Sequence, residues 1–186
     1  RYAVGQLVDN DAADPTDARL TWLGGRVRGC VKMDWVKRVC YWGDVMRVRG
    51  SEWRYDLDPL GAGQIVDTVE RFSVNGWAFD TGINIEFPFE FKPVLTIGYA
   101  RGSGDAPGTP GRDGAFRQTG LHQNDAKFRG PGRFHIYGEV MRPDLSNIAI
   151  GTLALGLPIG DDAWVEGVWH TYRQPFADDR IAGSRL

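Results

Sequence analysis

The sequence lacks the elements from which membrane helices, metal centres and common hydrolases are built. None of its hydrophobic runs approaches the roughly 18 consecutive apolar residues that a membrane-spanning helix needs. Its three histidines, His122, His135 and His170, show no spacing typical of metal ligands, and no Gly-x-Ser-x-Gly nucleophile motif is present. Two cysteines among 186 residues are too few for a disulfide scaffold. We therefore expect no cofactor and no metal site.

Lysine is scarce, and the basic residues are almost all arginine. Only four of the 22 basic residues are lysine, and the formal net charge of −2 gives no reason to expect nucleic acid as a partner. Basic charge gathers in two stretches: residues 26–49 carry seven basic and two acidic residues, and residues 112–142 carry six and three. Guanidinium groups suit carboxylates and phosphates, although a GC-rich genome produces the same arginine bias.

An initiator methionine and a signal peptide are also missing. The chain starts at Arg1 with neither a basic start nor an apolar leader run, so we expect a mature or partial sequence. Its length suits a single domain over residues 1–186. No segment shows helical periodicity, and a composition with 25 glycines and seven tryptophans favours an all-β protein.

The strongest positive signal is an alternation of side chains between residues 77 and 87. Odd positions are mostly large and apolar, and even positions are small or polar, a period of two that predicts a strand. A soluble sheet usually carries Lys, Thr and Glu on its polar face, whereas small polar faces are typical of membrane β-barrels. We expect one face to meet lipid and the other a lumen: Trp77, Phe79, Ile83, Ile85 and Phe87 outside, and Asp80, Asn84 and Glu86 inside.

Seven segments are expected to form strands separated by turn residues. They lie near residues 20–32, 38–49, 71–87, 94–101, 133–142, 147–157 and 163–174. Short connections alternate with long loops at about 50–70 and 102–132, an asymmetry typical of the two ends of outer-membrane barrels. The predicted fold is an antiparallel transmembrane β-barrel.

Two hairpins are predicted, one by a shared face and the other by a register that follows from the position of its turn. A turn at residues 89–92 places Leu95, Ile97 and Tyr99 on the apolar face of the 77–87 segment. For the strand near 147–157 the pattern leaves the inward parity open. In the first hairpin, two cysteines face each other and could form a disulfide in an oxidising compartment or stay thiols. Its turn about Trp35 pairs Arg26 with Asp44, Arg28 with Trp42 and Cys30 with Cys40, all on one face.

Residues 102–132 are expected to form a long loop that begins with glycine-rich sequence and continues with basic residues. Arg117, Lys127 and Arg129 lie on this loop, and Arg133 follows where it re-enters a strand. A loop folded back into a barrel would present such cations to an anionic solute, as constriction loops do in porins. A solvated surface loop is the plainer interpretation.

Several motifs together resemble the alginate export porins of Gram-negative outer membranes. The specific ones read FRQTGL at residues 116–121, RFHIYGEV at 133–140, RPDLSN at 142–147 and HTYRQ at 170–174. The resemblance covers most of residues 14–174 and implies a single-chain barrel of eighteen antiparallel strands. This chain would supply about seven of those strands and would be a partial sequence.

The resemblance implies a pore that exports a polyuronate across the outer membrane rather than an enzyme. Every uronate unit carries a carboxylate, so such a pore needs fixed positive charge spread over several weak sites. Its expected partners are the anionic polysaccharide, outer-membrane lipid and lipopolysaccharide, and export machinery in the periplasm. The residues expected to line the pore are Arg117, Arg133, Arg129, Lys127, Arg26, Arg28 and His135, with Asp44, Asp80 and Glu139 as supporting countercharges.

Two other classes of protein remain open from the residues alone. One is an enzyme acting on a polysaccharide, with His135, Glu139, Glu166 and His170 as candidates. His135 and Glu139 are four residues apart, about 13 Å along a strand, so they cannot form a direct acid–base pair. The other is a soluble β-barrel or sandwich that binds a ligand, in which the large aromatic rings would form the core.

Overall fold

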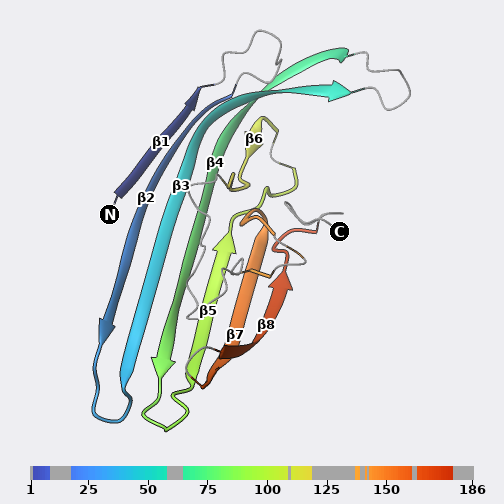
Figure 1. Ribbon diagram of the computed structural model, residues 1–186. Coiled ribbons are helices and arrows are strands. Elements are labelled where there is room, and N and C mark those ends of the chain that lie inside the picture. Colours follow the sequence, from blue (N-terminus) through green and yellow to red (C-terminus); the bar gives the residue numbers. More distant parts are fainter. Residues whose placement is uncertain are drawn as a thin grey trace.

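The computed structural model describes residues 2–8, 18–57, 65–108, 110–118, 137–138, 141, 143–160 and 163–177. These residues form one strongly curved antiparallel sheet (Figure 1). In the described part of the chain no helix is long and apolar enough to span a membrane. The expectation of an all-β antiparallel protein is confirmed.

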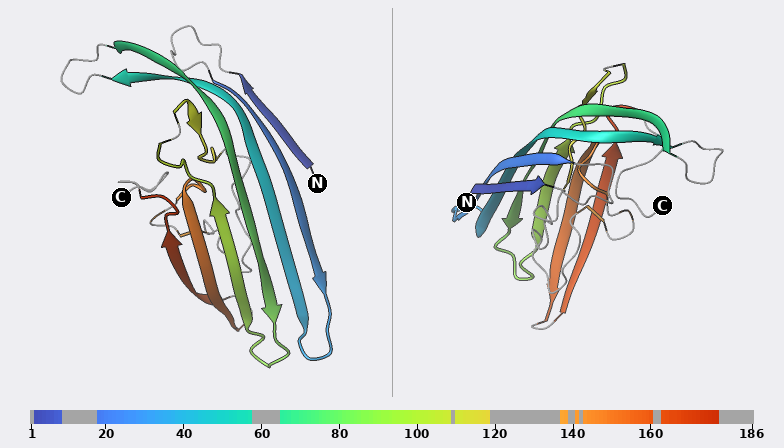
Figure 2. Two further views of the ribbon diagram at one scale, coloured as in Figure 1. Left: turned by 180° about the vertical axis from the view of Figure 1, so that it is seen from behind. Right: turned by 90° about the horizontal axis from the view of Figure 1, so that it is seen from above.

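Seven strands follow one another across the sheet in the order β1-β2-β3-β4-β5-β7-β8. Within the described residues β1 and β8 form the two edges, and the sheet does not close into a barrel (Figure 2). The short β6 lies off this path and pairs in parallel with β4. The strands are β1 (Tyr2–Val8), β2 (Arg19–Val31), β3 (Arg38–Leu57), β4 (Ile65–Glu86), β5 (Val94–Gly102), β6 (Arg112–Asp113), β7 (Ile148–Ile159) and β8 (Ala163–Arg173).

The prediction of a strand near 133–142 is wrong for the residues that the structure describes. Tyr137, Gly138 and Met141 lie outside any strand, and β5 pairs directly with β7, so no strand stands between them. Gly138 has a φ of 101°, a left-handed conformation that breaks an extended segment. The other residues of this segment lie outside the described part, and β1 was not expected from the sequence.

The expected long loop at 50–70 is wrong at both of its ends. β3 continues to Leu57 and β4 begins at Ile65, and the two strands stay paired over this stretch. The pairing passes through an irregularity between Tyr55 and Asp56, where one strand carries extra residues. Paired backbone therefore replaces most of the expected loop.

The predicted register of the first hairpin and the predicted shared face of the second are confirmed. β2 and β3 pair Arg26 with Asp44 and Cys30 with Cys40. β4 and β5 pair Ile83 with Ile97. The short connections of these hairpins lie at the same end of the sheet, here called the turn end; the opposite end, where β3 ends and β4 begins, is called the loop end (Figure 1).

The two faces of the sheet differ sharply in chemistry. Even-numbered residues of β2 to β5, β7 and β8 face the concave side, where the loop end carries a buried core, and pairing with β5 assigns Ile148 and Ile150 of β7 to this side. Phe116, which follows β6, is 1% exposed and packs into that core, so the 103–118 segment lies against the concave face. The odd-numbered convex face leaves large apolar side chains exposed, among them Leu23, Val27, Val45, Ile97, Leu153, Leu155, Val165 and Trp169.

Candidate functional site

The charged and aromatic side chains of the concave face form rows that run across neighbouring strands. Strand pairing sets the rows, because residues opposite each other on one face have adjacent Cβ atoms. Successive rows are about 7 Å apart along the strands, since a strand rises about 3.3 Å per residue. From the loop end towards the turn end, the rows on β2, β3 and β4 read Arg26–Asp44–Asp80, Arg28–Trp42–Gly82 and Cys30–Cys40–Asn84, followed by Arg38–Glu86 on β3 and β4.

Arg26 and Asp44 form the ion pair that their opposition in the hairpin allows. Arg26 Nε donates to Asp44 Oδ1 at 2.6 Å and Nη2 donates to Oδ2 at 3.2 Å. The arginine side chain is 44% exposed, so water screens the pair and its net contribution to stability is at most about 1 kcal/mol. Arg28, in the next row, is exposed and makes no ion pair with a described residue.

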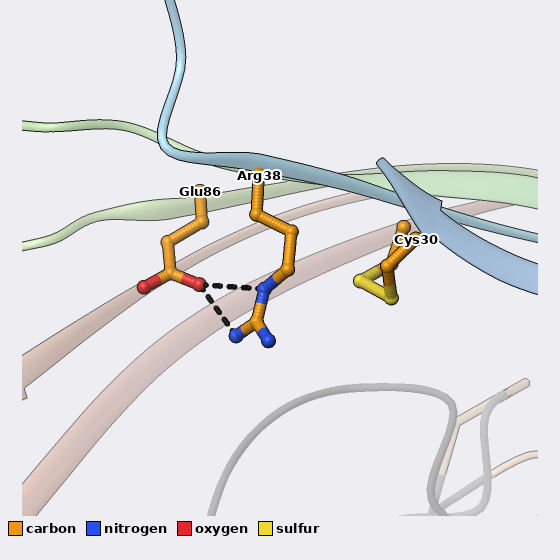
Figure 3. The surroundings of a disulfide bond; sticks show 4 residues. Cys30, Arg38 and Glu86 are labelled. Carbon is orange, nitrogen blue, oxygen red and sulfur yellow. Dashed lines mark hydrogen bonds and ion pairs between the residues drawn. A yellow bond between two sulfur atoms is a disulfide. The ribbon is translucent and has the colours of Figure 1, made fainter. Parts of the chain in front are cut away.

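Two cations share one carboxylate at the turn end of the concave face. Lys37 Nζ donates to Glu86 Oε1 at 2.6 Å, and Arg38 Nη2 donates to Glu86 Oε2 at 2.8 Å. The disulfide between Cys30 and Cys40 lies beside them and joins β2 to β3 (Figure 3). Of the two states open from the sequence, the structure therefore has the disulfide. The pair of cations leaves this group with a net positive charge.

Asp80 of β4 is the centre of a hydrogen-bond network that joins Tyr137 to β3 and β4. Its side chain is 4% exposed and accepts the Trp42 Nε1–H at 2.8 Å and the Tyr137 hydroxyl at 2.5 Å. Tyr172 of β8 donates in turn to the Tyr137 carbonyl at 2.7 Å. A buried carboxylate needs such donors because desolvation without them is costly. Tyr137 thereby links strands that are far apart in the sequence.

The 103–118 segment is held on the concave face by backbone and side-chain contacts. β6 pairs with β4 through Ser73 and Arg112, and Trp22 Nε1 donates to the Arg117 carbonyl at 2.9 Å. Gln118 Oε1 accepts the backbone N–H of Leu145 at 2.6 Å, which joins the segment to the stretch before β7. Of the two possibilities left open for this loop, packing against the concave face rather than full solvation is seen at residues 116–118.

Arg117 lies between two carboxylates at the loop end. Its guanidinium donates to Glu52 Oε1 at 2.8 Å and to Asp113 Oδ2. Burial lowers the pKa of Arg117, but the hydrogen bonds and charges of the two carboxylates outweigh this and the net pKa is raised. Its side chain is 29% exposed.

The structure brings together part of the residue set predicted from the sequence. Arg26, Arg28, Arg117, Asp44 and Asp80 all lie on the concave side of the sheet or on the segment packed against it. The remaining candidates lie outside the described residues: Lys127, Arg129, Arg133, His135 and Glu139.

Sequence reasoning missed the partners that fix the arginines. Glu52 was assigned to a loop and is 65 residues from Arg117, so no local pattern links the two. Lys37 and Arg38 meet Glu86 only because β3 pairs with β4. The one signal in the sequence for the contact between Arg38 and Glu86 is that both are even-numbered, like the other residues predicted to face inward.

The two described candidates for an enzyme do not form an acid–base pair. His170 Nδ1 lies 2.9 Å from Thr152 Oγ1. Glu166 is four residues from His170 on the same strand, β8, which corresponds to about 13 Å at the usual rise of a strand. Among the described residues no group of three or more His, Cys, Asp or Glu side chains is placed to hold a metal ion.

Fold and site define the class of this molecule as an all-β protein with an apolar convex face and a charged, partly covered concave face. Residues 5–186 match the family described as Alginate export, and the chain belongs to that family. This confirms the resemblance seen in the sequence. The family is one of transport rather than catalysis.

Two curated proteins are similar to the chain. It is 30% identical to alginate production protein AlgE of Pseudomonas aeruginosa over 98% of this chain and 36% of that protein. It is 28% identical to alginate production protein AlgE of Azotobacter vinelandii over 57% of this chain and 21% of that protein. The chain thus spans 36% of the length of the first relative and 21% of the length of the second.

Proposed function

We propose that the chain is part of an outer-membrane β-barrel channel that exports alginate, or a similar polyuronate, from a Gram-negative cell. The observation that carries this proposal is the sorting of side chains between the two faces. Large Leu, Val, Ile and Trp side chains are exposed on the convex face, which also carries Arg47, Arg49, Arg71 and Arg101 towards the loop end, while Arg26, Arg28 and Arg38 lie on the concave face together with carboxylates. This sorting suits lipid on one side and a watery lumen on the other. The chain would then form part of the barrel wall.

A polyuronate lumen needs positive charge that attracts the polymer without holding it. Each carboxylate of the polymer can exchange between cations as the chain advances, provided that no single site binds too tightly. Exposed arginines on successive rows, with acids close by, suit this requirement. In our proposal Arg26, Arg28 and Arg117 contribute from the described residues, supported by Asp44 and Asp80. Arg133, Arg129, Lys127, His135 and Glu139 remain predictions of the same kind.

In this proposal the turn end faces the periplasm and the loop end faces the exterior, because outer-membrane barrels have short periplasmic turns and long outer loops. The polymer would enter past Arg38 and leave past the 103–118 segment. Outer-membrane lipid and lipopolysaccharide would contact the convex face. A periplasmic export machinery would deliver the polymer at the turn end, and nucleic acid has no place in this account.

Planar bilayers test the proposed channel. The full-length protein should give an anion-selective current that alginate blocks. Arg117→Glu together with Arg133→Glu should weaken both the selectivity and the block, because two positive charges near the path become negative. A current that is cation-selective, or that polyuronate leaves unchanged, would refute the export proposal.

The convex face separates this proposal from a soluble ligand-binding barrel. Soluble monomers rarely expose a contiguous apolar patch as large as one face of a sheet. Trp77 is 40% and Trp169 is 64% exposed on that face. In liposomes that carry a quencher at a known depth, both fluorophores should be strongly quenched. A protein that is monomeric and stable without detergent would favour the soluble alternative.

A further inference from the structure

The charged residues on the convex face of the strands are all arginines where the structure describes the side chains. This face takes the odd-numbered residues, and no described odd-numbered side chain of β2 to β5, β7 or β8 is acidic. Each arginine lies on the loop-end side of the described aliphatic side chains of its own strand, as Arg47 follows Val45 on β3. The six exposed arginines of this face are Arg19, Arg47, Arg49, Arg71, Arg101 and Arg173.

The apolar band below these arginines has the height of the hydrocarbon region of a membrane. On β7 the odd-numbered residues from Ile159 to Ala149 are all aliphatic or glycine. They extend over about 33 Å of strand at the usual rise. A strand tilt of about 40° reduces this length to about 25 Å, the height of the apolar band in outer-membrane barrels. Arg101 and Arg173 pair with Ala149 from either side, so they lie at the edge of the band.

None of the six arginines forms an ion pair with a described residue. Arg47 Nε and Nη2 donate to Asn75 Oδ1 at 3.2 and 3.0 Å, and Arg71 Nη2 donates to Ser51 Oγ at 3.0 Å. These partners are neutral, so they orient the guanidinium groups without compensating their charge. The arginines of the concave ion pairs, by contrast, meet carboxylates. The edge of the apolar band therefore carries positive charge that is available to an anion from outside the protein.

Three of these arginines gather around one indole at the edge of the band. Arg47 of β3 lies directly opposite Trp77 of β4, and Arg101 of β5 has its Cζ atom 5.7 Å from the centre of the Trp77 ring. Arg49 is the next residue of β3 on the same face. The Cα atoms of Arg47 and Arg101 are about 12 Å apart by the spacing and rise of strands. Two arginine side chains can bridge this span with one phosphate group between them.

We propose that Arg47, Arg49 and Arg101 bind a phosphate group of lipid A, the phosphorylated glucosamine lipid that anchors lipopolysaccharide in the outer leaflet. Guanidinium groups bind phosphate oxygens through parallel hydrogen bonds. The acyl chains lie along the apolar band, and Trp77 lies at the level of the sugar, a position typical of aromatic residues at membrane interfaces. This inference rests on the proposed function, because that proposal turns the loop end towards the exterior and its lipopolysaccharide.

Titration of the full-length protein in detergent with bisphosphorylated lipid A tests the site, and native mass spectrometry counts the bound lipid. Arg47→Gln together with Arg101→Gln should weaken binding about tenfold, because two charge-assisted contacts to phosphate are lost. Arg49→Gln should weaken it about threefold. Since Arg49 makes no hydrogen bond or ion pair with a described residue, this variant removes no such contact within the described protein.

A matched double variant removes two exposed cations from the other end of the sheet. Lys32 and Lys92 lie in the short connections of the turn end, so Lys32→Gln together with Lys92→Gln should leave lipid A binding unchanged. Lipid A without its phosphates should bind the wild type and the double arginine variant equally, which excludes misfolding as the cause of a loss. Arg47→Lys together with Arg101→Lys should recover part of the affinity, because lysine keeps the charge without the planar fork.

The outcomes separate the lipid site from the channel. If polyuronate blocks the wild-type channel but the double arginine variant binds lipid A as tightly as the lysine control, the site is refuted while export stands. Displacement of lipid A by an equal concentration of inorganic phosphate, or equally tight binding of phosphatidylglycerol, would refute the assignment to lipid A. If binding depends on the arginines and on the phosphates but polyuronate does not block the channel, export is refuted and the lipid site is supported.

Discussion

The turn-end and loop-end halves of the concave face are built from the same strands but use their inward residues differently. At the loop end, Val48, Val74 and Phe116 are buried to 1% exposure or less. At the turn end, the side chains of Lys37 and Arg38 are 49% and 33% exposed. The loop end therefore holds the packed core, whereas the turn end presents charged side chains to water.

The comparison shows that arginine has two roles on one face. Arg117 donates to two carboxylates and has its carbonyl held by Trp22, so it anchors the 103–118 segment in addition to its proposed place in the pore. Arg28 is exposed and makes no ion pair with a described residue. The identity of a residue therefore predicts less about its role than the number of acids around it.

The largest expected effect is the loss of the core under the covering segment. Phe116→Ala removes a fully buried ring and should lower the free energy of unfolding by about 3–5 kcal/mol, because the cavity does not collapse completely. Denaturant titration of the full-length protein in lipid measures the change. Phe89→Ala, at a 55% exposed ring in a turn, is the control and should change little. Equal losses of the free energy of unfolding in the two variants would contradict the difference between the packed loop end and the exposed turn end.

The next effect concerns the charges that anchor Arg117. Arg117→Met should destabilise the protein by about 2–3 kcal/mol, because it leaves Glu52 and Asp113 close together without their cation. Adding Glu52→Gln and Asp113→Asn to that variant should restore most of the loss. Hydrogen exchange at residues 112–118 should rise in the single variant and fall again in the triple one. A triple variant less stable than the single variant would contradict an anchoring role.

Removal of the disulfide should produce a similar or smaller loss at the turn end. Cys30 and Cys40 are ten positions apart, and replacing both with serine should cost about 2–3 kcal/mol by the loop-closure estimate. Reducing agent should lower the stability of the wild-type protein and leave the double variant unchanged. Free thiols that titrate in the native, untreated protein would show that the bridge does not form.

The smallest effect is a pH dependence at the loop end. Burial raises the pKa of Asp144 above its ordinary value of 3.8, so the folded protein holds this proton more tightly than the unfolded chain does. Stability should therefore fall as pH rises from about 3.8 through the raised pKa, and then stay level. Asp144→Asn should lack this fall, so its advantage over the wild type should grow with pH in parallel unfolding titrations. A stability advantage of Asp144→Asn that shrinks as pH rises would contradict a raised pKa of Asp144.

The parts of the fold that the sequence predicts are those with a local pattern. Alternation over residues 77–87 and a short turn about Trp35 define which face a residue takes, because a strand has a period of two and a tight turn allows few registers. The same patterns placed Arg26 and Arg28 on the concave side with Asp44 and Asp80. Each of these assignments needs only neighbours along one hairpin.

The parts that it does not predict depend on contacts between distant residues. Glu52 and Arg117 are 65 positions apart in the sequence, and Tyr137 and Asp80 are 57 positions apart. No repeat in the sequence predicts either contact. The alternation in 133–142 is real, yet Gly138 adopts a left-handed conformation and Tyr137 is used as an anchor. Tertiary packing here overrides a local strand preference.

The most direct test of the whole account uses two neighbouring residues on opposite faces. In a Cys30→Ser, Cys40→Ser background, a cysteine at position 28 and a cysteine at position 27 are each treated with a charged, membrane-impermeant thiol reagent in proteoliposomes. Arg28→Cys should react quickly and be protected by added alginate, since it faces the export path, whereas Val27→Cys should react slowly because it faces lipid. Equal rates at the two positions, or no protection of position 28 by alginate, would contradict the assignment of the concave face to the polymer.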